Sequence, residues 1–99
     1  MLVRIVQLHI KPENLGLFLS LYGGHHAGIG NFRGCRSLKL LQDVQNPNMV
    51  ATLSEWESEE DLNHYRYSDF FKNLWSQVKP LFESQARAFS YHIYSPESN

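Results

Sequence analysis

The order of the apolar segments limits the fold of this chain of 99 residues more than any other feature of its sequence. Four segments are short and rich in bulky or β-branched apolar residues, which predicts strands: 2–10, 35–43, 49–56 and 86–94. The second and third are joined by the turn-forming sequence QNPN, so they are expected to form a hairpin. Helical spacing occurs between the first and second strands and between the third and fourth. The predicted order is therefore β-α-β-β-α-β.

Amphipathic helices are predicted in both of these intervals. The first begins near Pro12, because a first helical turn does not need the N–H group that proline lacks. The residues of its predicted inner face follow one another at helical spacing: Leu15, Phe18, Leu19, Tyr22, His26 and Ile29. The second interval has two predicted helix caps, Ser58 and Ser68, and Pro80 is expected to kink or shorten its last helix. The stripe after the second cap consists of Phe71, Leu74, Trp75, Val78 and Phe82.

The fold class predicted from this order is α+β, in the ferredoxin-like pattern of one antiparallel four-stranded sheet with helices on one face. The length indicates a single domain, which we place at residues 1–95, followed by a polar tail at 96–99. The predicted helices can cover only one face of the sheet, so the other face stays open, yet both faces of the strands carry apolar residues. A large exposed apolar face is a liability in a monomer. We therefore expect a homodimer in which two open sheet faces pack together.

Five of the six glycines lie in one stretch, LYGGHHAGIGNFRGC. A dinucleotide-binding fingerprint would need a further glycine where an arginine stands, and it would follow a strand rather than a helix. We expect the first helix to fade here, loosened by Gly23 and Gly24, because glycine is a poor helix former. On this interpretation His26 lies on a loosened helix end, and His25 faces solvent.

Composition excludes several classes of function. With 9 basic and 10 acidic residues the chain has a net charge of -1 and no basic patch, so no nucleic-acid partner is expected. No apolar run reaches the roughly 18 residues of a membrane span. Arg4 interrupts the apolar N-terminal run, which is not typical of a signal peptide. We therefore expect a cytoplasmic protein with no membrane partner. The single Cys35 forms no internal disulfide, and the adjacent His25 and His26 would point about 100° apart on a helix. No metal or other cofactor is therefore expected.

The stretch TLSEWESEEDLNHYRYSDFFKNLW resembles the antibiotic biosynthesis monooxygenase (ABM) family of the dimeric α+β barrel superfamily. The matching positions are a strand-ending Trp56, the capping Ser58, Leu62, Tyr65, Ser68 and Phe71, together with Gly34 and Cys35 before the second strand. The resemblance implies the ferredoxin-like fold, a dimeric α+β barrel and a pocket between the sheet and the helices of one subunit. The family includes cofactor-free oxygenases of aromatic polyketides, quinol oxygenases, haem-degrading enzymes and many proteins of unknown role.

The resemblance and the helical faces together suggest six residues as the lining of that pocket. They are Gln7, Tyr22, His26, Tyr65, Phe71 and Trp75. Three of these residues have an alternative interpretation. Trp75 is also explained by core packing, His26 by a hydrogen-bonded role at the surface, and Gln7 by a place in the dimer interface. No catalytic residue is assigned, because the Trp, Tyr, Asn and Arg set of the polyketide oxygenases cannot be placed in full. Haem degradation is disfavoured, because Trp75 stands where that branch has its iron-ligating histidine.

The function predicted from the resemblance is a cofactor-independent monooxygenase of a small aromatic or quinol-type compound. Such an enzyme needs to bind its substrate, shield it from water and help to remove a proton. Aromatic walls with one or two polar groups meet these needs. The alternative is a non-catalytic dimer of the same fold that binds a small molecule.

Overall fold

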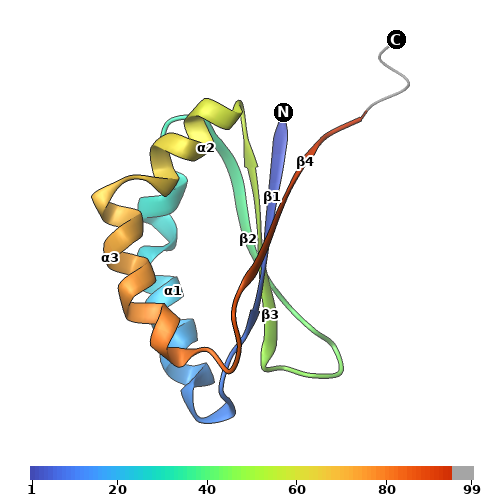
Figure 1. Ribbon diagram of the computed structural model, residues 1–99, viewed down its shortest axis with the longest axis vertical. Coiled ribbons are helices and arrows are strands. Elements are labelled where there is room, and N and C mark those ends of the chain that lie inside the picture. The colour runs from blue at the N-terminus through green and yellow to red at the C-terminus, as the bar shows by residue number, and fades with distance from the viewer. Residues whose placement is uncertain (95–99) are drawn as a thin grey trace.

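The computed structural model describes residues 1–94 and has the predicted α+β fold, with the helices on one face of a four-stranded sheet (Figure 1). The strands are β1 (Leu2–His9), β2 (Cys35–Gln42), β3 (Met49–Trp56) and β4 (Arg87–His92). They lie in the order β2-β3-β1-β4, and each neighbouring pair is antiparallel. The helices are α1 (Leu15–Gly30), α2 (Glu59–Arg66) and α3 (Asp69–Val78), with 3-10 turns η1 (Pro12–Asn14) and η2 (Lys79–Leu81). The predicted order is confirmed, and the predicted tail at 96–99 lies outside the described residues.

Local sequence signals explain where α2 and α3 begin and where α3 ends. The hydroxyl of Ser58 caps α2 by accepting a hydrogen bond from the backbone N–H of Asp61 at 3.1 Å. Ser68 caps α3 in the same way, accepting from the backbone N–H of Phe71 at 3.1 Å. Pro80 lies in η2, directly after α3 has ended. Both predicted caps and the predicted shortening are therefore confirmed.

Helix α1 continues through the glycine-rich stretch. It is 16 residues long and stays helical through Gly23 and Gly24 to Gly30. Its buried residues are Phe18, Tyr22 and Ile29. Burial of this face stabilises the helix by more than the roughly 1 kcal/mol per glycine that poor helix propensity costs. The expectation that the helix fades was wrong, because propensity is a local quantity and the buried face belongs to the whole fold.

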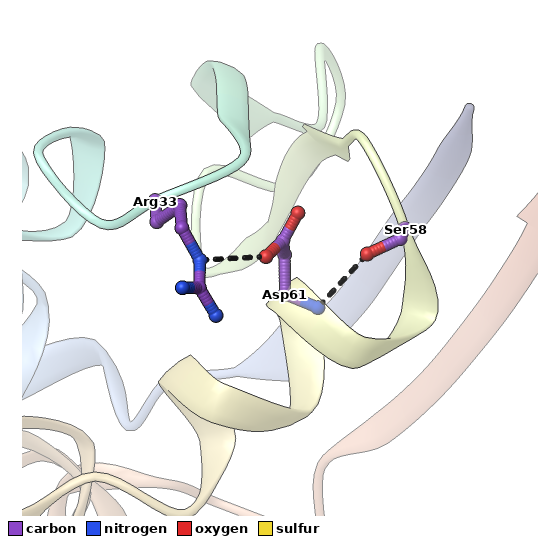
Figure 2. A network of polar contacts seen from close by, with 3 residues as sticks. All are labelled: Arg33, Ser58 and Asp61. Carbon is purple, nitrogen blue, oxygen red and sulfur yellow. Dashed lines mark hydrogen bonds and ion pairs between the residues drawn. The ribbon is translucent and has the colours of Figure 1, made fainter.

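The loop between α1 and β2 is attached to the start of α2 (Figure 2). Arg33 Nε donates a hydrogen bond to Asp61 Oδ1 at 3.2 Å. The backbone N–H of the same Asp61 donates to the capping hydroxyl of Ser58. Gly34 is the only residue in 1–94 with a positive φ, at 84°, and a Cβ at this position would overlap the Asp61 side chain. The backbone N–H of Glu57 also donates to Gly34 O at 2.8 Å. Only glycine combines an easy positive φ with the absence of a Cβ, and both are needed at position 34.

Alternate residues of the strands face opposite sides of the sheet. On β1, Leu2, Arg4, Val6 and Leu8 face the helices, whereas Val3 and Ile5 face away from them. We call the uncovered side the open sheet face. Register places these apolar residues on it: Val3, Ile5, Leu41, Leu53, Phe89 and Tyr91. Leu41 is 45% exposed and Tyr91 53% exposed, so this face presents accessible apolar side chains in the single chain.

The core lies between the helices and the covered face of the sheet. Its larger cluster joins Leu8, Ile10 and Val50 to the inner faces of α1 and α3. The smaller cluster surrounds Trp56, which is fully buried against Leu2 and Leu62. The space between these two clusters is not filled by side chains, and the candidate site lies there.

Candidate functional site

A cavity of about 350 Å³ lies between the covered face of the sheet and the three helices. Helix α1 packs most closely on β2 and α2 on β3, and the side of the sheet next to β4 is less covered. The lining on this side consists of small side chains, Ala88 of β4 and Ala86 directly before the strand. Ala88 and Ser90 are exposed although their register places them on the covered face, so the cavity opens to solvent along β4. The volume suits a small molecule.

Aromatic side chains form a large part of the wall. The six that line the cavity are Phe18, Tyr22, Trp56, Tyr65, Phe71 and Trp75. The ring of Tyr65 stacks on Trp56 at a centroid distance of 5.3 Å and meets Phe71 edge-on at 5.2 Å. Phe71 in turn stacks on Trp75 at 5.7 Å. This continuous run of rings makes a rigid apolar surface that suits another flat ring.

The hydroxyl of Tyr22 is the most unusual polar group of the site. Its Oη is buried and has no hydrogen-bond partner among the described residues. A buried polar group without a partner costs roughly 1–3 kcal/mol. Burial, with a smaller contribution from the neighbouring Cys35 thiol, raises the pKa of Tyr22 to about 12. The phenol is therefore neutral at ordinary pH, and it can donate a hydrogen bond to a ligand or to water.

Tyr65 is the second phenol of the lining. Burial raises the pKa of Tyr65 well above its usual range, and the neighbouring Tyr22 and Cys35 raise it further. The indole N–H of Trp56, in contrast to the Tyr22 hydroxyl, has a partner within the protein, because it donates to Ser54 Oγ at 2.9 Å. Both phenols are thus available as neutral donors.

Two arginines complete the polar lining. Arg4 extends from the covered face of β1, and Arg66 extends from the last turn of α2. Burial, and then the positive charge of Arg66, lowers the pKa of Arg4, although a guanidinium stays protonated at any ordinary pH. Sequence reasoning missed both residues, yet each left a signal. Arg4 interrupts an apolar strand face, and Arg66 lies four residues after Leu62, on the same face of the helix.

Four of the six predicted lining residues meet at the cavity: Tyr22, Tyr65, Phe71 and Trp75. The other two lie elsewhere. His26 is exposed, with Nε2 3.2 Å from Leu38 O, and does not line the cavity. Gln7 is exposed on the open sheet face, where it borders a separate shallow hollow. The reason is the same for both, because the phase of a helix turn or of a strand pleat decides which side a residue faces.

His25 corrects a further expectation. It is half-buried rather than facing solvent, and its ring meets Phe70 edge-on at 5.7 Å. Its Nδ1 lies 2.7 Å from Leu21 O, one turn earlier in α1. His25 therefore helps to join α1 to α3, and it is a structural residue.

No group of three or more His, Cys, Asp or Glu side chains within residues 1–94 is arranged to hold a metal ion. In the same part of the chain, no helix is both long and apolar enough to cross a membrane.

Comparison with known proteins agrees with this fold. A crystal structure of an antibiotic biosynthesis monooxygenase has 21% sequence identity and a TM-score of 0.89, covering 96% of this chain and all of the other. A conserved protein from Methanosarcina mazei Go1 has 24% identity and a TM-score of 0.86, covering 92% of this chain and 91% of its own. A candidate antibiotic biosynthesis monooxygenase from Nitrosomonas europaea has 15% identity and a TM-score of 0.89, covering 96% and 100%. At these identities the likeness establishes the fold alone.

No curated protein sequence matches the chain. Its residues 1–75, however, match the family described as antibiotic biosynthesis monooxygenase. This match extends from β1 into α3 and includes three quarters of the chain. The chain therefore belongs to the antibiotic biosynthesis monooxygenase family.

Proposed function

We propose that this protein is a cofactor-independent monooxygenase that oxidises a small aromatic or quinol-type compound in the aromatic cavity. An anthrone-type substrate loses a proton and becomes electron-rich enough to pass electrons to O2. In the balanced reaction a CH2 group and O2 give a carbonyl group and water. The substrate supplies all four electrons, one oxygen atom enters it, and the other leaves as water. The protein needs only to bind the substrate, exclude water and stabilise the deprotonated form.

The observation that carries this proposal is the unpartnered Tyr22 hydroxyl beside a wall of stacked rings. A flat substrate would pack against Tyr65, Phe71 and Trp75. The neutral phenol of Tyr22 would donate a hydrogen bond to a substrate oxygen, which becomes more basic as the substrate loses its proton. Such a bond strengthens as negative charge develops, which is what catalysis requires.

A second candidate function has its own support. Among residues 1–94, no Asp, Glu or His side chain lines the cavity, and both phenols have raised pKa values. No group of the lining is therefore suited to accept a proton near neutral pH. This favours a dimer that binds an aromatic compound without oxidising it, unless the substrate is acidic enough to ionise by itself.

Oxygen uptake distinguishes the two functions. The protein is incubated with a panel of anthrones and hydroquinones, and oxygen consumption is compared with the spontaneous rate for each compound. The monooxygenase should accelerate at least one compound, and Tyr22→Phe should slow that reaction about 10-fold or more, as expected for loss of one hydrogen bond to a charged atom. Tyr94→Phe is the matched control, because Tyr94 is 80% exposed and does not line the cavity. Binding without acceleration for every compound would support the second function.

The open sheet face supports a homodimer. It exposes apolar residues on all four strands, and association of two such faces would remove them from water. We propose that two copies pack through this face and close an α+β barrel. Sedimentation at micromolar concentration tests the proposal, and a monomer at that concentration would contradict it.

A further inference from the structure

Two positive charges face the cavity, and no negatively charged side chain of residues 1–94 lines it. Arg4 Nη1 donates to Ser90 Oγ at 2.9 Å, and Arg66 Nη1 lies 3.4 Å from Asn63 Oδ1, so both have neutral partners. Arg66 also lies over the ring of Tyr67, 5.9 Å from its centroid. The ion pairs found in residues 1–94 involve other arginines, Arg33 and Arg36.

Arg4 carries its charge at a partly buried position beside the cavity. No carboxylate of residues 1–94 lines the cavity, and most of the remaining wall is aromatic or aliphatic. Partial burial weakens the hydration of a guanidinium, and the two like charges repel each other. Neither effect is relieved within the described part of the chain. The net charge of the whole chain is -1, so the positive charge is a local property of this cavity.

We infer that the cavity binds an anionic aromatic compound, whose rings pack on the aromatic wall and whose carboxylate lies against Arg4 and Arg66. A guanidinium presents its N–H groups as a planar fork that matches the two oxygens of a carboxylate. The arginines come from β1 and α2, so a single anion on both of them would join the sheet to the helical layer. This inference rests on the proposed role of the cavity as an aromatic binding site, and it names the charge class of the compound.

A series of matched probes tests the inference on the wild-type protein. Anthracene-9-carboxylate, 9-(hydroxymethyl)anthracene and 9-(aminomethyl)anthracene share one ring system and differ in charge. Their dissociation constants are measured by titration calorimetry or by quenching of tryptophan fluorescence, since Trp56 and Trp75 both line the cavity. The carboxylate should bind about 10-fold tighter than the alcohol or better, and the amine more weakly than the alcohol.

Charge-removing variants locate the effect. Arg4→Met and Arg66→Met keep an unbranched apolar stem and remove the guanidinium, and each should reduce the advantage of the carboxylate over the alcohol about 10-fold. Arg36→Met is the matched control, because it removes the same charge from an exposed, ion-paired site outside the cavity. Circular dichroism checks that each variant is folded, and the three probes on the wild-type protein decide the matter if a variant is not.

Each outcome has a distinct meaning. Equal affinity for the carboxylate and the alcohol, or an equal loss in Arg36→Met, would overturn the inference and leave the aromatic site intact. Failure of all three anthracenes to bind would overturn both the inference and the proposed aromatic site. Tight binding of the carboxylate without accelerated oxygen uptake by any related anthrone would support the inference and contradict the monooxygenase.

Discussion

Gly28 is the glycine of α1 for which the fold has a steric requirement, and replacing it tests that requirement. A Cβ built at Gly28 would lie 2.6 Å from Phe70 Cζ and 2.7 Å from Phe70 Cε2, which is well inside van der Waals contact. The ring of Phe70 cannot move away freely, because it packs edge-on against His25 at 5.7 Å and against Phe32 at 5.6 Å. Gly28→Ala therefore forces α1 and α3 apart or displaces this group of rings.

The magnitude follows from two opposing effects. Overpacking a formed contact costs about 1–3 kcal/mol. Alanine is also the better helix former, by roughly 0.8–1 kcal/mol relative to glycine. Gly28→Ala should therefore lower the free energy of unfolding by about 0–2 kcal/mol. Gly23→Ala is the matched control, because it lies in the same helix with no atom within 4 Å of its Cβ, and it should raise the free energy of unfolding by about 0.5–1 kcal/mol.

Urea and thermal denaturation, at one protein concentration because association shifts apparent stability, measure the difference. The two variants should differ by about 1–3 kcal/mol, which corresponds to a difference of at least about 4 °C in Tm for a domain of this size. In a Phe70→Ala background the Gly28→Ala change should become stabilising, like the change at Gly23. Equal stability of the two single variants would refute the argument that contact with Phe70 requires glycine at position 28.

Four further substitutions test other features of the protein. Ser58→Ala and Ser68→Ala each remove a helix cap and should lower the free energy of unfolding by about 1 kcal/mol in urea titrations, whereas unchanged midpoints would contradict the capping roles. Because burial raises the pKa of Tyr22 from 10.0 to about 12, the folded state holds this proton more tightly than the unfolded state, so stability should fall as the pH rises from 10 to 12. Denaturation across that range should show a smaller fall for Tyr22→Phe, and an identical fall would exclude Tyr22 as a contributor. Ile5→Glu places a charge on the open sheet face and should yield a monomer in sedimentation, whereas an unchanged dimer would assign the interface to another surface.

Residue patterns predicted part of the lining of the candidate site. Tyr22, Tyr65, Phe71 and Trp75 were predicted as lining residues, and they meet at the cavity, because helical spacing identifies the inner face of a helix. His26 belongs to the same spacing, but it lies at the edge of the inner face and remains exposed, whereas Ile29 further along α1 is buried. Arg4 and Arg66 are far apart in sequence, and no local pattern could show that they share a cavity.

Sequence alone determined the order of strands and helices, the two serine caps and the end of α3, because these depend on interactions between residues a few positions apart. It also placed apolar residues on both faces of the sheet, since strand alternation is a local property. Only the tertiary structure decided that α1 continues through its glycines, that Gly28 allows close contact with Phe70, and that two arginines face one aromatic cavity. These features depend on burial, on contact between separate elements and on charges brought together by the fold, so no segment carries them by itself.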